Sequence, residues 1–463
     1  MSQQALIEPR VERRPDPVSI VVLQDSFPSR GLFIPRNEGR ANRRRTSSFA
    51  ASRRAGLVYD EKPVTAAATV LSRHGHQPAG SDFSTLEQAP GMFEELNMLG
   101  VTAAAFRDAD EADKIARELA DDYEYVADFA LRLPDPQLRA TSRVAGAAAV
   151  AKLAEAEWPE ESGIPRARKD GNDGRGVLIG TLDTGVDAGH QEFANKTIHF
   201  RYVGNYPKST HWPCRDVFGF DTDHHGTHVS GIIAGKTRGI VPGAKFYMAS
   251  VIESESTLTT LTRIIEGLDW LLKSFASVEN QDVPAVVNLS LALPSAAPGD
   301  IRPAEYETRI RSMRYVIEAL LAANVLTVAA IGNNGEDTFG YPGAFSETLG
   351  VGAVNFSRQV ASFSGNRRFI DGPIEAEKPD LVGFGVEVFS SIERDCDGQS
   401  YYGPANGTSM AAPYVTGIAA LYRAALPDVP AAEIRQMVLE KCLPIDGQPA
   451  HRIGAGLARY MEE

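Results

Sequence analysis

The sequence predicts an α/β fold with a mainly parallel central sheet, preceded by a small α+β domain. Two observations carry this prediction. In the C-terminal two-thirds, short apolar segments alternate with helical segments, as expected for strands that are buried on both faces of a parallel sheet. Before them, a strand-like, a helix-like and another strand-like segment follow one another. The 463 residues are long enough to bury a core in each domain.

The first part of the chain is strongly basic. Residues 1–58 contain eleven arginines against five acidic residues, although the whole chain has a net charge of −13. We expect one short strand at Val18–Leu23, followed by a solvated basic arm that ends at residue 58, because no hydrophobic periodicity follows. The acidic body argues against nucleic acid as the main partner.

Residues 59–137 are predicted to form the small α+β domain. Val101–Phe106 reads as a strand. Asp108–Leu119 has apolar residues at helical spacing and begins with a residue that favours the helix N-cap. Tyr123–Leu133 alternates again and is expected as a further strand.

Residues 138–176 are predicted to be a helix and a linker. The stretch 138–160 is rich in alanine and favours a helix. It leads to Gly163–Gly176, which has four glycines and is expected to be an exposed, cleavable loop.

The larger domain is predicted to span residues 177–463. Five short apolar segments are expected as strands, with amphipathic helices between them. The strands are Val177–Asp183, Lys245–Val251, Ala285–Leu291, Val325–Ala330 and Leu349–Val354, and the helices include Thr227–Ala234 and Leu258–Ser274.

The cellular compartment is predicted from the first residues and from the cysteines. Residues 1–17 have charges and prolines where a signal peptide has its apolar core, and no segment is long enough to span a membrane. Cys214, Cys396 and Cys442 cannot form a full disulfide framework. We therefore expect a cytoplasmic protein.

The first candidate catalytic segment is Thr181–Phe193, where Asp183 lies at the end of a predicted strand. Pepsin-like aspartic proteases also use Asp-Thr-Gly, but they need two such carboxylates and this chain has one copy. Taken alone, Asp183 is also compatible with a simple strand-end turn.

The second segment, Asp221–Gly235, contains several potential metal ligands. The candidates are Asp221, Asp223, His224, His225 and His228. Zinc binds such residues, so a metal-dependent hydrolase is one reading. Small apolar residues after Thr227 instead indicate a tightly packed helix that presents His225 at its N-terminal end.

Two further segments complete the set. Asn333 follows an apolar strand and Gly332, and a side-chain amide there could donate to developing negative charge, although Asn and Gly also favour plain turns. Ser409 lies at the start of a predicted helix that runs to about Leu426, where backbone N–H groups are unpaired. Alone, Ser409 would be read as an ordinary N-cap.

Chemistry links these residues. A serine hydroxyl is a weak nucleophile and needs a base within hydrogen-bond reach. A histidine suits this role because its ordinary pKa is about 6.5, and a carboxylate fixes its tautomer. The tetrahedral intermediate needs preorganised donors for its oxyanion.

The chain resembles the subtilisin-like serine proteases. The resemblance rests on DTG at Asp183, HGTHVSG from His225, GNNG from Gly332 and NGTSMAAP from Asn406, in the chain order of that family. It extends over about residues 158–458 and implies a subtilisin-like three-layer fold.

The resemblance also implies a mechanism. The protein is expected to be a serine endopeptidase that works through an acyl-enzyme. Asp183 would orient His225, His225 would act as general base and then acid, and Ser409 would be the nucleophile. Asn333 and the Ser409 backbone N–H would form the oxyanion hole.

The N-terminal α+β domain is similar to the inhibitory propeptides of the same family. This implies that the domain inhibits its own enzyme, assists its folding and is removed by self-cleavage between residues 133 and 176. A permanent regulatory or partner-binding domain is the alternative.

The substrate is expected to be a polypeptide that adds to an edge strand at Val286–Ala292. Ser290, Leu291 and Ala292 are the expected contacts, and Ala292 stands where the family usually has glycine, which narrows the primary pocket. On the opposite wall, Glu253 leads an acidic run, so we expect a preference for lysine or arginine.

No cofactor and no metal site are predicted. The loop at residues 234–239 is too short and too basic for the calcium site that the family often has there. Asp187 and Asp223 are left as calcium candidates elsewhere. Besides the metal-dependent hydrolase, a catalytically silent subtilase-fold binding module is the other alternative function.

Overall fold

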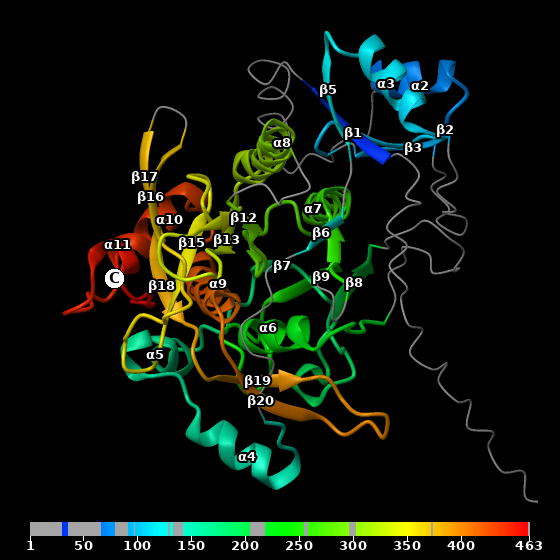
Figure 1. The fold of residues 1–463 in the computed structure, drawn as a ribbon. Helices are drawn as coiled ribbons and strands as arrows, with labels where there is room; N and C mark the ends of the chain where they lie inside the picture. Colours follow the sequence, from blue (N-terminus) through cyan, green and yellow to red (C-terminus); the bar gives the residue numbers. More distant parts are fainter. Residues whose placement is uncertain are drawn as a thin grey trace, which may run out of the picture.

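The computed structural model describes residues 30–35, 66–78, 91–96, 98–127, 130–132, 142–203, 218–253, 258–295, 302–371 and 374–461. A large layered region and a small N-terminal region are visible in Figure 1. The strand expected at Val18–Leu23 and the Arg-rich stretch Arg36–Arg54 lie outside the described residues.

Seven described strands form the parallel sheet of the large region, in the order β18-β15-β13-β11-β7-β9-β8. The prediction of a buried parallel sheet is therefore confirmed. The strands are β7 (Leu178–Asp183), β8 (Ile198–Tyr202), β9 (Lys245–Ser250), β11 (Ala285–Leu289), β13 (Val325–Ala330), β15 (Leu349–Val354) and β18 (Leu381–Phe384).

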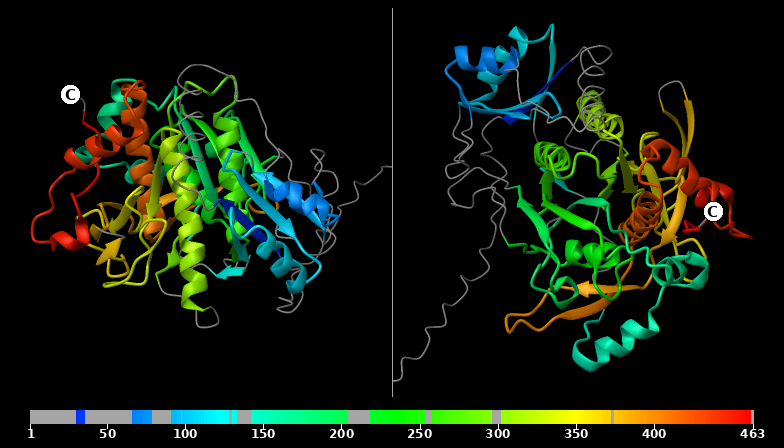
Figure 2. Two further views of the ribbon diagram at one scale, coloured as in Figure 1. Left: turned by 90° about the horizontal axis from the view of Figure 1, so that it is seen from above. Right: turned by 180° about the vertical axis from the view of Figure 1, so that it is seen from behind.

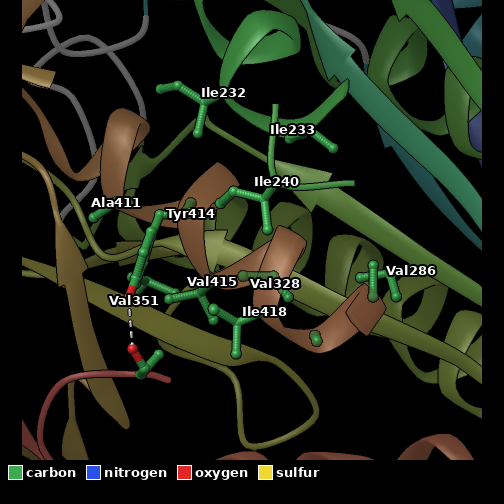
Figure 3. Packing of buried hydrophobic residues seen from close by; sticks show 14 of the residues in the cluster. Ile232, Ile233, Ile240, Val286, Val328, Val351, Ala411, Tyr414, Val415 and Ile418 are labelled. Atoms are coloured by element: carbon green, nitrogen blue, oxygen red, sulfur yellow. Dashed lines mark hydrogen bonds between the residues drawn. The ribbon is translucent and has the colours of Figure 1, made fainter. Parts of the chain in front are cut away.

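Helices cover both faces of this sheet, which gives the expected three layers. Because side chains alternate along a strand, Val286 faces one core and Val287 faces the other. The first core includes residues of α6 and α9 (Figure 3), and the second includes residues of α7 and α8. These helices are α6 (His225–Ala234), α7 (Leu261–Phe275), α8 (Pro303–Ala322) and α9 (Thr408–Ala425).

Smaller elements surround the layers. The hairpin of β19 (Val388–Ile392) and β20 (Tyr401–Ala405) lies against α6. The others are the hairpin of β16 (Arg367–Asp371) with β17 (Ile374–Lys378), the pair β12 (Leu293–Pro294) with β14 (Gly340–Tyr341), and the helices α10 (Ala431–Glu440) and α11 (Ala450–Ile453).

The N-terminal region contains five described strands in the order β2-β3-β4-β1-β5. Strand β1 pairs with β4 and β5 in the interior of the sheet. A basic arm that ends at residue 58 is therefore wrong as a boundary, because Arg30–Pro35 belongs to the folded domain. The elements are β1 (Arg30–Pro35), α2 (Ala66–Arg73), β2 (Gln77–Pro78), β3 (Met92–Leu96), β4 (Val101–Ala105), α3 (Ala109–Glu118) and β5 (Tyr123–Ala127).

The two faces of this small sheet pack against different partners. Phe33 lies in a core with residues of α2 and α3, whereas its neighbours Leu32 and Ile34 share a core with α7 and α8. The second view in Figure 2 shows the small sheet beside the large region. Asp108 caps α3 by accepting the Glu111 N–H at 2.8 Å, as expected.

The linker differs from the prediction. Its first helix is shorter, as α4 (Gly146–Glu155), and the expected loop Gly163–Gly176 contains the helix α5 (Ile164–Lys169). Ile164 and Ala167 of α5 are fully buried, so this stretch is not an exposed junction. The reason is that its apolar residues join the core of the large region.

Two predicted elements are each divided in two. The segment Tyr123–Leu133, predicted as one strand, forms β5 and a separate strand, β6 (Ala130–Arg132). The segment Leu258–Ser274, predicted as one helix, forms the short strand β10 (Leu258–Thr260) followed by α7. Strand β6 pairs antiparallel with β10. A strand that follows the N-terminal sheet thus adds to the large region.

The described helices include none with the combination of length and hydropathy that a bilayer-spanning segment needs. The 20-residue helix α8 carries several charged residues along its length.

Candidate active site

The candidate catalytic residues meet at one edge of the parallel sheet. Asp183 is the last residue of β7, and Asn333 follows β13. The C-terminal ends of parallel strands form the usual ligand-binding edge of such sheets. Ser409, the second residue of α9, is tied to the same edge through Ser290, which follows β11.

Asp183 and His225 are directly bonded. His225 is the first residue of α6, and its Nδ1–H donates to Asp183 Oδ1 at 2.7 Å. Asp183 is fully buried, and its Oδ1 also accepts the Thr184 N–H at 2.7 Å. The His225 Nε2 atom has no hydrogen-bond partner among the described residues, so it is available to a reacting group.

The surroundings of His225 favour its charged form. Burial alone would lower the pKa of the imidazole, but the charge of Asp183 and the hydrogen bond to it outweigh burial. Together with Asp223 and Asp221, they raise the pKa of His225 to about 9. The site is thus built to stabilise an imidazolium.

Asp221 holds the start of α6. Its Oδ2 accepts the Thr227 N–H at 2.6 Å, one of the unpaired donors of the first helical turn, and its Oδ1 accepts the Thr184 hydroxyl at 2.7 Å. The Thr184 Oγ1 accepts the Gly226 N–H at 2.9 Å. Burial raises the pKa of Asp221, against the lowering effect of these hydrogen bonds.

Gly226 allows α6 to approach the end of β7 closely. A Cβ atom at this position would lie 2.0 Å from the Gly185 carbonyl oxygen. A larger residue would therefore push His225 away from Asp183.

The metal-site reading of Asp221–Gly235 does not fit the side-chain directions. His228 Nε2 donates to Gly403 O at 3.1 Å, and burial lowers the pKa of His228 to about 3. Asp221 holds backbone and hydroxyl donors, and His225 holds Asp183. In the part of the chain that the structure describes, no group of three or more His, Cys, Asp or Glu side chains is arranged to hold a metal ion.

Asp187, one of the two calcium candidates, has an arginine partner instead. Arg394 donates to both carboxylate oxygens, with Nη2 at 2.8 Å from Oδ1 and the backbone N–H at 2.8 Å from Oδ2. These bonds lower the pKa of Asp187, although burial opposes them.

Ser409 and Ser290 form a reciprocal pair. The Ser290 hydroxyl donates to Ser409 O at 2.9 Å, and the Ser409 Oγ lies 3.3 Å from Ser290 O. Asn288 Nδ2 in turn donates to Ser290 Oγ at 3.0 Å. Ser290, expected as a substrate contact, thus also helps to fix the position of Ser409.

Asn333 Nδ2 and the Ser409 N atom both lie close to Gly407. Asn333 Oδ1 accepts both the N–H and the hydroxyl of Thr408 at 2.8 Å, which leaves the Nδ2 donors free of this interaction. A Cβ at Gly407 would lie 3.5 Å from Asn333 Nδ2 and 3.5 Å from the Ser409 N atom. Gly407 has a φ of 153°, a backbone conformation that residues with a side chain rarely adopt.

The expected substrate strand needs correction. Residues 285–289 form β11, which lies between β7 and β13 in the sheet and is not an edge strand. Only Ser290, Leu291 and Ala292 extend past the sheet, and all three are buried. The Ala292 Cβ faces Gly332 and Gly340: Cβ atoms built on these glycines would lie 3.7 and 2.7 Å from it.

Glu253 is not a free charge. Its Oε1 accepts Tyr202 Oη at 2.6 Å and Arg263 Nη2 at 2.9 Å. Arg263 is fully buried, and its Nε also donates to Val203 O. The expected selectivity for lysine or arginine loses this support, and residues 254–257, which hold the rest of the acidic run, lie outside the described ranges.

Sequence reasoning missed the positioning residues Asp221, Thr184 and Thr408. Asp221 was assigned only as a possible metal ligand. The signal that could have found its role is its place shortly before a helix start, where aspartate commonly satisfies N–H groups. Nothing in the local sequence indicates that Thr184 and Thr408 join separate segments.

Comparisons with known proteins identify relatives of this chain. The chain is 44% identical over 434 residues to "Subtilisin-like protease PopC" of Myxococcus xanthus (strain DK1622), covering 92% of this chain and 87% of that protein. It is 28% identical over 287 residues to "Subtilisin DY" of Bacillus licheniformis, covering 59% of this chain and 88% of that protein. The structure titled "Structure of Prenylagaramide maturation protease PagA" matches with a TM-score of 0.49 at 21% identity, covering 64% of this chain and 96% of that one.

A family model covers most of the large region. The model described as Peptidase_S8, subtilase family, matches residues 174–456, which include Asp183, His225, Asn333 and Ser409. The match spans more than half of the chain. The chain belongs to the subtilase family.

Proposed function

We propose that Ser409, His225 and Asp183 carry out the serine endopeptidase reaction of this subtilase. The Ser409 Oγ attacks the peptide carbonyl carbon while His225 Nε2 takes its proton. His225 then gives that proton to the leaving amine, which departs and leaves an acyl-enzyme. A water molecule then gives a proton to His225 and attacks the acyl-enzyme, and His225 returns the proton to Ser409 as the carboxylic acid product leaves. Asp183 holds the Nδ1–H tautomer throughout.

Asn333 Nδ2 and the Ser409 N–H are proposed to stabilise the oxyanion of the tetrahedral intermediate. Donors fixed in place before the reaction cost no reorganisation when charge develops. Asn333 is held in place by its two bonds to Thr408, and the Ser409 N–H is held by the start of α9.

The observation that carries this proposal is the bonded Asp183–His225 pair, in which the Nε2 atom has no hydrogen-bond partner among the described residues. The Ser409 hydroxyl is directed to Ser290 O in this structure, and hydrogen bonds of resting enzymes commonly tighten only with substrate. Phenylmethylsulfonyl fluoride should label Ser409 and stop hydrolysis, whereas a chelator should leave hydrolysis unchanged. The reverse result would favour the metal-dependent hydrolase, and no hydrolysis at all would favour a silent binding module.

Substrates are polypeptides. We infer that they contact Ser290, Leu291 and Ala292 on the acyl side of the scissile bond. The Ala292 methyl group faces Gly332 and Gly340 and narrows the space between them, which favours small side chains there. Hydrolysis of peptides that differ only in having Ala, Leu or Phe before the scissile bond tests this, and equal rates would contradict it.

The N-terminal region is proposed to inhibit the enzyme to which it is attached. Its strand β6 adds antiparallel to β10, as a peptide substrate would add to an exposed strand. Asp269 of α7 accepts the Met98 N–H at 3.0 Å, and Tyr315 of α8 donates to Leu99 O at 3.0 Å. These contacts hold the small sheet against α7, which directly follows β10, and against α8.

Self-cleavage is proposed between Arg132 and Val144, on the chain that links the two regions. Intact-mass analysis of the wild type beside Ser409→Ala provides the test. Shortening only in the wild type supports self-cleavage and gives its site. Two full-length proteins, with hydrolysis of peptides by the wild type, would favour the permanent regulatory domain.

Neither a cofactor nor an oxidising compartment is part of the proposed mechanism. The side chains and the backbone N–H named above supply every proton transfer and every charge-stabilising group of the proposed mechanism. Cys396 and Cys442 are both free thiols in the described structure, which fits the predicted cytoplasmic location. That location is tested by fractionation of cells that express the protein.

A further inference from the structure

The linker after the N-terminal region binds to the hairpin that leads into the nucleophile. Val144 and Tyr402 form an antiparallel bridge, with each backbone N–H 2.9 Å from the other residue's carbonyl oxygen. Tyr402 lies in β20, which runs directly into the loop before Ser409. The linker thus adds to the free edge of the β19–β20 hairpin, because the other edge of β20 pairs with β19.

Side chains of α4 reinforce this bridge. Ala149 and Leu153 share a buried cluster with Phe389 of β19 and Tyr402 of β20. Arg143 Nη2 also donates to Glu393 Oε1 at 3.3 Å. The hairpin itself is bonded to α6, the helix that carries His225, through the His228 bond to Gly403 O and through the hydroxyl groups of Ser390 and Ser391.

The two anchors of the linker lie far apart on the large region. Strand β6 pairs with β10 near α7 and β9, whereas α4 lies beyond the β19–β20 hairpin (Figure 1). The right-hand view of Figure 2 also places the N-terminal sheet and α4 at opposite ends of the large region. Cleavage between Arg132 and Val144 leaves β6 on the acyl side and Val144 on the leaving-group side.

We propose that the free edge of β20 is a binding surface for the leaving-group side of long polypeptides, and that residues 142–156 of the chain itself occupy it after self-cleavage. This rests on the proposed function. Short peptides, which end soon after the scissile bond, do not need this surface. Long chains have to displace the linker, so the enzyme discriminates against them until the linker is released.

The helix α4 offers a matched pair of substitutions. Ala149→Asp with Leu153→Asp places two charges in the buried cluster, where unpaired charges are strongly unfavourable. Val150→Asp is the control, because Val150 lies on the same helix and is 65% exposed. The double variant should release the linker, and the control should not.

The test uses protein that is produced as the whole chain and has completed self-cleavage. Its substrates are two quenched fluorescent peptides. The peptides share one sequence and differ only in having two or ten residues after the scissile bond. We expect the ratio of kcat/KM for the long peptide to that for the short one to rise roughly tenfold in the double variant, the change that 1.4 kcal/mol of competition produces. The ratio should stay at the wild-type value in Val150→Asp.

Hydrogen exchange at the Tyr402 amide reports linker release directly, because that N–H is bonded to Val144 O. The amide should be protected in the wild type and in Val150→Asp, and exposed in the double variant. Retained protection in the double variant would contradict the assigned packing, and lost protection with an unchanged ratio would contradict the competition. If the wild type hydrolyses neither peptide, the proposed function itself fails.

Discussion

The catalytic sheet and the N-terminal sheet are both covered on two faces, but by different parts of the chain. Val286 and Val287 of β11 face two cores that are built largely from the helices of the catalytic region itself. Phe33 of β1 faces helices of its own region, whereas Leu32 faces α7 and α8 of the catalytic region. The N-terminal sheet completes its burial only in contact with the rest of the molecule.

Because of this difference, separating the two regions should affect the stability of the N-terminal region more than that of the catalytic region. The catalytic region keeps most of its core when the N-terminal region leaves, whereas the N-terminal sheet would then expose an apolar face. Two buried carboxylates illustrate the contrast. Asp183 acts inside the catalytic region, and Asp269 crosses the junction to hold Met98 and Leu99.

The largest effect is expected for Asp183→Asn. An asparagine at this place does not enforce the required tautomer of His225, and kcat/KM should fall by roughly 10⁴-fold. Loss of the carboxylate charge should also move the pKa of His225 down from about 9. A general base must be neutral, so the rate of any residual hydrolysis should rise with pH around a lower midpoint than in the wild type.

Nuclear magnetic resonance of the His225 ring in a Ser409→Ala background measures this pKa in the uncleaved protein. An unchanged pKa on adding Asp183→Asn would contradict the assigned pair. Amide exchange in the N-terminal sheet should not change, because within the described residues the Asp183 hydrogen bonds all lie inside the large region.

Asn333→Ala should lower kcat by roughly 10²–10³-fold, the size of effect measured for an oxyanion-hole asparagine in subtilisin itself. KM should change little, because the donor acts in the transition state. Asn333→Asp separates this role from a structural one, since a carboxylate still accepts from Thr408 but cannot donate. Wild-type kcat in Asn333→Asp, measured on a short peptide, would overturn the oxyanion assignment.

The candidate catalytic residues stand out in the sequence because each lies at a local transition. Asp183 and Asn333 follow apolar strands, and His225 and Ser409 begin helices with small residues. The parallel strands were visible for the same reason, as continuous apolar runs. The local pattern of apolar residues was sufficient to predict strands that are buried on both faces.

Long-range pairing was not visible. The segment Arg30–Pro35 is short and is followed by a basic stretch, and the residues with which it pairs in β4 and β5 lie about 70 to 95 positions away, so nothing local marks it as a central strand. Glu253 was read as a free acid because Arg263 reaches it from the following helix. The helix α5 was read as a loop because glycines flank it, although Ile164 and Ala167 enter the core.

A smaller effect is expected for Asp269→Ala, which should weaken the contact between the N-terminal sheet and α7. The Met98 and Leu99 N–H groups lose their acceptor, which for a charged group costs about 1.5–3 kcal/mol. In a Ser409→Ala background, exchange of these two amides should therefore become roughly 10- to 100-fold faster. Asp269→Asn keeps an acceptor oxygen and should show a smaller increase, and unchanged exchange in Asp269→Ala would contradict the role of the carboxylate.

The smallest effect is expected for Arg311→Ala, at the rim of the same junction. Arg311 Nη2 lies 3.2 Å from Glu124 Oε1, but the two side chains are 55% and 31% exposed. Exposed pairs contribute about 0.2–1 kcal/mol, so exchange in β4 and β5 should quicken by no more than roughly fivefold. Added salt should remove the difference from the wild type, because it screens exposed charges.

Glu124→Gln serves as the matched partner of Arg311→Ala and should give the same small change. An Arg311→Ala effect larger than that of Asp269→Ala would mean that the charged rim holds the N-terminal sheet in place. We expect a larger effect on amide exchange from Asp269→Ala than from Arg311→Ala. The Asp269 carboxylate is buried beside the apolar face, away from water, whereas the Arg311–Glu124 pair is solvated whether the N-terminal sheet is attached or released.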